Sequence, residues 1–165
     1  MTASSPGPRP TFRLLLAPGF VALAVWLLVV ALRGAERPAP PERPDAAAVR
    51  AVLEAQVAAW NRGDLEAFMA GYWQSDALTF FSGKDRTQGW QATLKRYRKK
   101  YQADGKEMGQ LSFSDLEVRL AGPDTAWVRG RWQVVTSRET VGGLFTLIFE
   151  KKAEGWRIVH DHTSG

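Results

Sequence analysis

The sequence predicts an α+β fold in which amino-terminal helices pack inside a strongly curved antiparallel sheet, with one transmembrane helix ahead of this domain. Three observations indicate it: an uncharged apolar run near the amino terminus, helical periodicity between Ala46 and Gln102, and alternation of period two from Gln110 onward. A sheet with one polar face needs cover on its other face, and the helices can supply it. With 165 residues, the chain has room for one globular domain and a short appendage.

The apolar run extends from Leu14 to Leu32 and contains nineteen residues without a charge. At 1.5 Å per residue, a helix of this length spans about 28 Å, close to the hydrocarbon thickness of a bilayer. Arg33 stands directly before the small pair Gly34-Ala35, where a signal peptide would be cleaved. We therefore expect an uncleaved anchor, and the alternative is a signal segment whose removal leaves a secreted or periplasmic domain.

Residues 1–13 form a short tail before this segment, and residues 33–44 form a linker after it. Four prolines in the linker exclude a helix and predict a polyproline spacer of about 30 Å. A tail of thirteen residues stays in the cytoplasm more readily than it crosses the membrane. We therefore expect residues 45–165 to be the extracytoplasmic domain of a single-pass protein of the cell membrane.

Charge and cysteine content exclude several classes of function. The chain carries 22 Lys and Arg against 17 Asp and Glu, and residues 1–44 hold five of the basic and two of the acidic residues. Residues 45–165 therefore have a net charge of only +2, whereas a nucleic-acid-binding domain needs a stronger basic footprint. The chain has no cysteine, which excludes disulfides, thiol catalysis and thiolate metal sites.

Two helices open the domain. Asp45 is expected to cap a helix that begins at Ala46, and Gly63 ends this helix. Asp64 caps a second helix that runs to about Trp73, and so short a connection makes a helical hairpin or corner. The apolar stripe of the first helix comprises Val49, Val52, Leu53, Val57 and Trp60.

A short strand, Ala77–Ser82, leads through a polar turn into a third helix from about Thr87 to Gln102. The basic run Lys95–Lys100 is interpreted as the solvated face of this helix, and attraction to anionic lipid headgroups is the functional alternative. The inward face carries Trp90, Leu94, Tyr97 and Tyr101.

Four strands in a meander complete the domain, and each turn contains the glycine that such reversals need. The expected strands are Gln110–Leu120, Thr125–Ser137, Gly143–Lys152 and Gly155–Thr163. The expected turns are Gly122-Pro123-Asp124, Val141-Gly142-Gly143 and Ala153-Glu154-Gly155.

Alternation along the strands predicts which side chains face the hollow of the sheet. On the second strand, Trp132 is expected on the concave face, and Trp127, Arg129 and Arg131 on the outer face. On the third strand, Phe145 is expected to point inward. The last strand should carry one face made of Trp156, Ile158, His160 and His162, which would bring two imidazoles to an apolar pocket.

Several short motifs, in this order of elements, resemble one known superfamily. They are Trp60-Asn61-Arg62-Gly63-Asp64-Leu65, Ser82-Gly83 followed by Gly89-Trp90, and Gly155-Trp156-Arg157-Ile158-Val159-His160-Asp161-His162-Thr163-Ser164. Over residues 46–165 the chain resembles the nuclear transport factor 2-like superfamily, and within it the SnoaL-like proteins of uncharacterised function. The association domain of calmodulin-dependent kinase II is similar, because it also ends in a strand with His-x-His-x-Ser-Gly, which residues 160–165 match.

The resemblance implies a cystatin-like cone and a homodimer through the outer sheet face, here Trp127, Arg129 and Arg131. It also brings in enzymes, since ketosteroid isomerases and polyketide cyclases share this fold. Those isomerases carry an acidic base on the first strand, and the corresponding Thr79-Phe80-Phe81-Ser82 has no carboxylate. The resemblance therefore supports the fold more strongly than it supports an enzymatic activity.

We expect the domain to bind a small, mainly apolar molecule in its cone. The alternative at this point is that the aromatic side chains simply fill the cone and the histidines are packing residues. The candidate ligand-binding residues are Trp60, Tyr72, Phe80, Trp90, Tyr97, Trp132, Phe145, His160 and His162.

Two further functions remain open. His160 or His162 could be the general base of an isomerase, cyclase or dehydratase, because an imidazole titrates near neutral pH. The second open function is that of a homo-oligomeric assembly module. No cofactor is expected, and no metal site either, because the two histidines lack a third ligand and Asp161 should point the opposite way.

Overall fold

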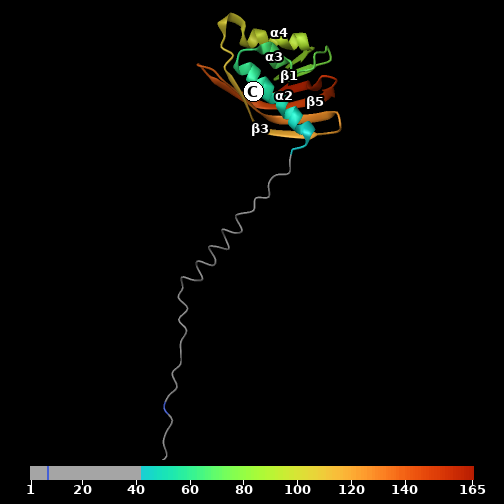
Figure 1. Ribbon diagram of the computed structural model, residues 1–165. Coiled ribbons are helices and arrows are strands. Elements are labelled where there is room, and N and C mark those ends of the chain that lie inside the picture. The colour runs from blue at the N-terminus through green and yellow to red at the C-terminus, as the bar shows by residue number, and fades with distance from the viewer. Residues whose placement is uncertain (1–6, 8–41) are drawn as a thin grey trace, which may run out of the picture. The chain divides into compact units, whose positions relative to one another are not determined.

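The computed structural model describes Gly7 and residues 42–165 (Figure 1). The expected tail, the expected anchor and most of the expected linker lie outside the described residues. Within the described part of the chain, no helix combines the length and the apolar character that crossing a bilayer requires. Residues 42–165 form one compact unit with a hydrophobic core of its own.

The helices are α2 (Pro44–Asn61), α3 (Leu65–Met69) and α4 (Trp90–Tyr101), followed by the short 3-10 helix η1 (Ala103–Gly105). The prediction that Asp45 caps the first helix is wrong. The helix α2 already begins at Pro44, a residue suited to the first helical position. The Asp45 Oδ1 atom instead accepts hydrogen bonds from Lys151 Nζ at 2.8 Å and Trp156 Nε1 at 3.2 Å. Asp45 thus ties the start of α2 to the sheet.

Asp64 caps α3 as expected, since its Oδ1 accepts a hydrogen bond from the Ala67 N–H at 2.9 Å. The helix ends at Met69 rather than near Trp73, because the backbone that follows joins the sheet. The Ile158 N–H donates to the Gly71 carbonyl at 3.0 Å, and the Trp73 N–H donates to the Ile158 carbonyl at 2.9 Å. These bonds hold the buried Tyr72, which lies between Gly71 and Trp73, against a strand.

Within residues 42–165, one sheet of six strands curves around the helices, in the order β2-β1-β6-β5-β4-β3 (Figure 1). The β1 and β6 strands pair in parallel, and the other neighbours are antiparallel. The strands are β1 (Thr79–Ser82), β2 (Asp85–Gln88), β3 (Gln110–Leu120), β4 (Thr125–Val135), β5 (Thr140–Lys152) and β6 (Gly155–Thr163).

Two parts of this sheet differ from the sequence-based expectation. The β2 strand replaces the expected polar turn, because its mostly exposed polar side chains give no alternation to detect. The turn before β5 lies at residues 136–139 and not at Val141–Gly143, because the Thr136 hydroxyl accepts hydrogen bonds from the Arg138 and Glu139 N–H groups. Residues 141–143 therefore extend β5.

The pairing of β5 with β6 contains a β-bulge. Ile148 pairs with His160, but the next residue of β5, Phe149, pairs with Ile158, so Val159 is an extra residue on β6. Because side chains alternate along a strand, one extra residue exchanges the two faces for everything that follows it. The final four residues of β6 therefore point opposite to the expected directions.

The core lies between the helices and the concave face of the sheet. Inward-facing Val128 and Val134 on β4, and Phe145 on β5, are buried as alternation predicts. The largest fully buried apolar side chains come from both layers: Leu53, Met69, Leu78, Phe149 and Ile158. The predicted α+β architecture of helices against a curved sheet is thus confirmed for residues 42–165.

Candidate functional site

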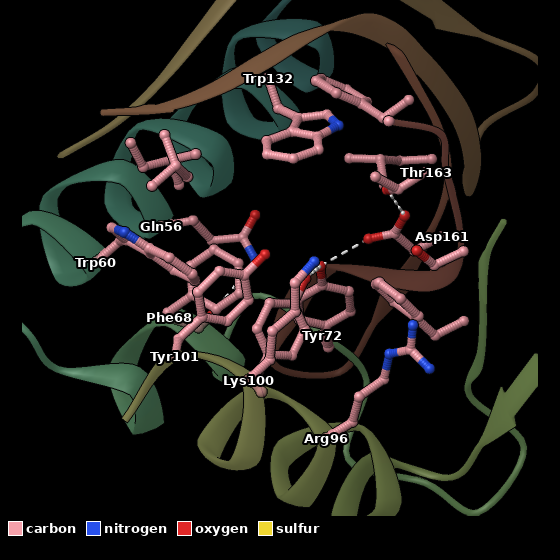
Figure 2. A pocket seen from close by; sticks show the side chains of 18 of the residues that line it. Gln56, Trp60, Phe68, Tyr72, Arg96, Lys100, Tyr101, Trp132, Asp161 and Thr163 are labelled. Atoms are coloured by element: carbon pink, nitrogen blue, oxygen red, sulfur yellow. Dashed lines mark hydrogen bonds between the residues drawn. The ribbon is translucent and has the colours of Figure 1, made fainter. Parts of the chain in front are cut away.

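A cavity opens between the helices and the concave face of the sheet (Figure 2). Its volume open to the centres of water-sized molecules is about 80 Å³, enough for several waters or part of a small organic molecule. Nine of its nineteen lining residues are aromatic, and the full lining is Gln56, Trp60, Phe68, Tyr72, Phe80, Ser82, Arg96, Tyr97, Lys100, Tyr101, Leu111, Phe113, Trp132, Val134, Phe145, Leu147, Asp161, Thr163 and Gly165.

Six of the nine candidate ligand-binding residues line this cavity, namely Trp60, Tyr72, Phe80, Tyr97, Trp132 and Phe145. Trp90 lies outside it: the Trp90 Nε1–H donates to the Met69 carbonyl at 2.9 Å, and the ring packs against the core. Phe68, Tyr101 and Phe113 add three aromatic rings that were not among the candidates. The helices provide one aromatic wall and the sheet provides the other.

The expectation that His160 and His162 share a face with Trp156 and Ile158 is wrong, because of the β-bulge at Val159. His160 pairs with the exposed Ile148, and neither histidine is among the lining residues. His160 Nδ1 lies 2.6 Å from Thr79 Oγ1, and burial lowers the pKa of His160, with a smaller effect from His162. The structure therefore removes the two imidazoles from the cavity and with them the proposed histidine base.

Asp161, and not His160 or His162, faces the cavity from the last strand. Its side chain lines the cavity and the residue is only 3% exposed. The Tyr72 hydroxyl donates to Asp161 Oδ2 at 2.7 Å, and the Thr163 hydroxyl donates to Oδ1 at 2.5 Å (Figure 2). The Tyr97 hydroxyl lies 3.5 Å from that of Tyr72 and extends this polar cluster into the aromatic wall.

Burial controls the protonation of this cluster. It raises the pKa of Asp161 from the ordinary value of 3.8 to about 6, and the hydrogen bonds from Thr163 and Tyr72 limit the rise. Burial also raises the pKa values of Tyr72 and Tyr97 well above 10, so both hydroxyls keep their protons at neutral pH. A carboxyl group with a pKa near 6 can take up or release a proton near neutrality, and the tyrosines can donate hydrogen bonds beside it.

Sequence reasoning missed Asp161 because it assumed regular alternation to the end of the chain. One signal was present: Ile158 and Val159 are consecutive apolar residues in an otherwise alternating strand. Such a pair is compatible with a β-bulge, but it does not show on which side of the pair the alternation changes. The position of Asp161 depends on the observed pairing with β5.

A family model for the SnoaL-like domain matches residues 49–165. The solved structures to which this chain is similar include nuclear transport factor 2-like proteins. The chain belongs to the SnoaL-like domain family. The resemblance noted in the sequence is thereby confirmed. No curated protein matches the chain.

A nuclear transport factor 2-like protein of unknown function from Shewanella oneidensis MR-1 is 39% identical, with a TM-score of 0.67, over 71% of this chain and 96% of that chain. A protein from Thiobacillus denitrificans ATCC 25259, described as a calcium/calmodulin-dependent protein kinase type II association domain, is 22% identical, with a TM-score of 0.58, over 70% of this chain and 92% of that chain. A protein of the same fold from Streptomyces avermitilis, described as a dehydratase, is 22% identical, with a TM-score of 0.56, over 73% of this chain and 94% of that chain. The last two similarities are evidence for the fold alone.

The raised pKa of Asp161 predicts a specific dependence of stability on pH. Between pH 4 and 6 the folded state holds a proton on Asp161 that the unfolded state releases, so the free energy of unfolding falls as the pH rises. A rise in pKa from 3.8 to about 6 corresponds to about 3 kcal/mol. In urea unfolding, the stability of the wild type relative to Asp161→Asn should fall by up to about 3 kcal/mol between pH 4 and 7.

His160 also makes the free energy of unfolding depend on pH, because its lowered pKa makes stability rise as the pH rises towards 6.5. Both proteins contain His160, so its contribution cancels when the wild type is compared with Asp161→Asn. Thr163→Val is the matched variant, because it keeps the carboxyl group but removes a hydrogen bond that lowers its pKa. It should move the transition to higher pH. Equal pH dependence in the wild type and Asp161→Asn would contradict a buried Asp161.

Proposed function

We propose that this domain binds a small, mainly apolar molecule in the cavity, with the Asp161 carboxyl group and its tyrosine partners contacting the end of that molecule that lies against β6. The observation that carries the proposal is the composition of the cavity: aromatic walls around one buried polar cluster. Ligand sites in proteins commonly combine an apolar lining with a few converging polar groups that orient the ligand.

The walls are rigid enough to hold a defined shape. The Trp60 ring lies edge to face against Phe68 and Tyr101, with centroid distances of 5.1 Å and 4.7 Å. The Trp60 Nε1–H also donates to the Met108 carbonyl at 3.2 Å, which holds the indole in place. A preformed apolar cavity reduces the ordering that binding must otherwise impose, and this favours affinity for a small ligand.

Substitution of Trp132 tests whether the cavity binds ligands. It borders the cavity on β4 and is only partly buried, so Trp132→Ala should reduce the free energy of unfolding by less than about 2 kcal/mol. The same change should weaken binding of indole or p-cresol about tenfold, measured by changes in NMR chemical shift, because the sheet side of the cavity loses its largest aromatic ring. Trp127→Ala is the matched control: Trp127 lies on the same strand, faces outward and is also partly buried.

The control should leave affinity unchanged within about twofold. Equal losses in both variants would place binding outside the cavity. A destabilisation of about 3 to 5 kcal/mol by Trp132→Ala, without any bound probe in the wild type, would identify Trp132 as packed core and contradict the proposal.

A second candidate function, proton transfer on the bound molecule, is favoured by the raised pKa of Asp161. As a carboxylate, Asp161 can accept a proton from a carbon next to a carbonyl group, while the Tyr97 hydroxyl donates a hydrogen bond to the carbonyl oxygen. Both Asp161 oxygens already accept one hydrogen bond, but a carboxylate has lone pairs for further partners. This base replaces the histidine base of the sequence-based hypothesis.

Deuterium exchange at the carbon next to the carbonyl of phenylacetone tests this second function by NMR. The exchange rate with the wild type should rise with pH through about 6, as Asp161 loses its proton. Asp161→Asn should exchange about 10² to 10⁴ times more slowly. Identical rates with both proteins would exclude proton transfer by Asp161 and leave binding as the function.

We further propose that residues 14–32 anchor the domain in the cell membrane, on the extracytoplasmic side. We also propose that the domain forms a homodimer through its outer sheet face. That face carries Leu144, 52% exposed, and Ile148, 37% exposed, on the strand next to Trp127 and Arg129. Exposed apolar side chains beside an aromatic ring and an arginine are typical of a protein interface. Arg129 lies over the Trp127 ring, 5.4 Å from its centroid, and pairs with Glu117 at 2.6 Å, so the arginine is held in place.

Removal of residues 1–41 tests both proposals in one preparation. The full chain should fractionate with membranes, whereas residues 42–165 should remain in solution, because their core is complete without the anchor. In sedimentation, this domain should be a dimer, and Ile148→Lys should convert it to a monomer. Ala58→Lys, on an exposed position of α2, is the control and should stay dimeric.

Two results would contradict these proposals. A mature amino terminus between Ala31 and Glu36 would show that the segment is a cleaved signal peptide. A monomeric domain at concentrations of about 0.1 mM would exclude a stable dimer through this face.

A further inference from the structure

Two cations of α4 border the cavity at its rim. Arg96, which is partly buried, and Lys100, which is exposed, are one helical turn apart and both line the cavity, whereas Lys95 and Lys99 of the same helix do not line it. Figure 2 shows both side chains extending from α4 toward the space enclosed by the aromatic rings. Residues 95–100 are therefore not only a solvated face, because these two cations also border the cavity.

The aromatic walls hold both cations at the rim. The Arg96 guanidinium lies 5.6 Å from the centroid of Phe80, and the Lys100 ammonium lies 5.0 Å from the centroid of Tyr101. Arg96 also contacts Asp85 Oδ2 at 3.3 Å, but that carboxylate is 59% exposed and competes weakly with a ligand in the cavity. Two cations held together over aromatic rings at the rim of a cavity attract an anion more strongly than either cation does alone.

The charges inside the cavity agree with an anionic ligand. Asp161 is the acid among the lining residues of the described chain, and it belongs to the opposite, sheet side of the cavity, bound to Tyr72 and Thr163. At neutral pH the cavity therefore has a cationic rim on α4 and an acidic, hydrogen-bonding end on β6. An elongated molecule with one anionic group would satisfy the rim and leave its body between the aromatic walls.

We infer that the ligand of this cavity is a small amphipathic carboxylate, whose carboxylate pairs with Lys100 and Arg96 and whose apolar body lies between Trp60, Tyr101 and Trp132. This inference rests on the proposed binding function and specifies its ligand class. Lys100 and Arg96 act as specificity-determining residues, because a neutral analogue of the same shape gains nothing from them.

Matched pairs of probes separate charge from shape. Indole-3-acetate, phenylacetate and hexanoate are compared with indole-3-acetamide, phenylacetamide and hexanamide, by NMR titration of the domain of residues 42–165. At least one carboxylate should bind about tenfold more tightly than its amide at about 50 mM salt, and this advantage should shrink at about 500 mM salt.

Lys100→Gln should remove most of the carboxylate's advantage and leave affinity for the amide within about twofold. Lys99→Gln, which removes a neighbouring exposed charge, is the control and should change neither. Arg96→Gln provides a second, independent variant at the rim and should act in the same direction as Lys100→Gln.

The failure of this inference differs from the failure of the proposed function. Equal binding of carboxylates and amides, unaffected by Lys100→Gln, would overturn the anionic class and preserve a cavity for apolar molecules. If none of the six probes binds, both fail. Binding to vesicles rich in phosphatidylglycerol, without binding of any soluble carboxylate, would assign this helix to the membrane surface and also overturn the inference.

Discussion

The register of β6 against β5 determines which chemistry the cavity contains. Val159 is the unpaired residue of the β-bulge, so residues before and after it point to opposite faces relative to a regular strand. Ile158 fills the core, while Asp161, three residues later, also faces inward. Parallel pairing with β1 supports this arrangement, since it places the Thr79 hydroxyl 2.6 Å from His160 on the other face. Without the extra residue, the cavity would contain two imidazoles and no acid.

A buried carboxyl group among aromatic rings is costly unless it is hydrogen-bonded or protonated, and here both conditions contribute. Tyr72 reaches Asp161 because α3 ends early and the backbone that follows it bonds to Ile158. The early end of α3 and the β-bulge of β6 therefore both contribute to this hydrogen bond. Burial among these rings raises the pKa of Asp161 to about 6. Arg96 and Lys100 complete the site from α4, and the result is a cavity with distinct polar ends.

Much of this fold could be predicted from periodicity, because helices and half-buried strands impose clear patterns on residues such as Val49 and Phe145. The β2 strand could not, since Asp85–Gln88 is polar on both faces. Six of the nine aromatic residues of the cavity could be predicted, because helical periodicity indicates residues such as Trp60 and Tyr97, and regular alternation on β4 and β5 indicates Trp132 and Phe145. Three polar residues of the cavity could not be predicted. The inward direction of Asp161 depends on the β-bulge, and the positions of Arg96 and Lys100 depend on how α4 is rotated over the sheet. Rotation and register are set by tertiary packing and leave little trace in a single sequence.

The most direct test of this account uses the absence of cysteine from the chain, which allows single cysteines to be placed without background. Asp161→Cys and His162→Cys are introduced separately into residues 42–165, and the rate of reaction with a water-soluble thiol reagent is measured at neutral pH. The β-bulge predicts slow labelling at position 161, slowed further by a bound ligand, and fast labelling at position 162, unaffected by ligand. Fast labelling at 161 together with slow, ligand-sensitive labelling at 162 would show that the strand has regular alternation and that the histidines, not Asp161, face the cavity.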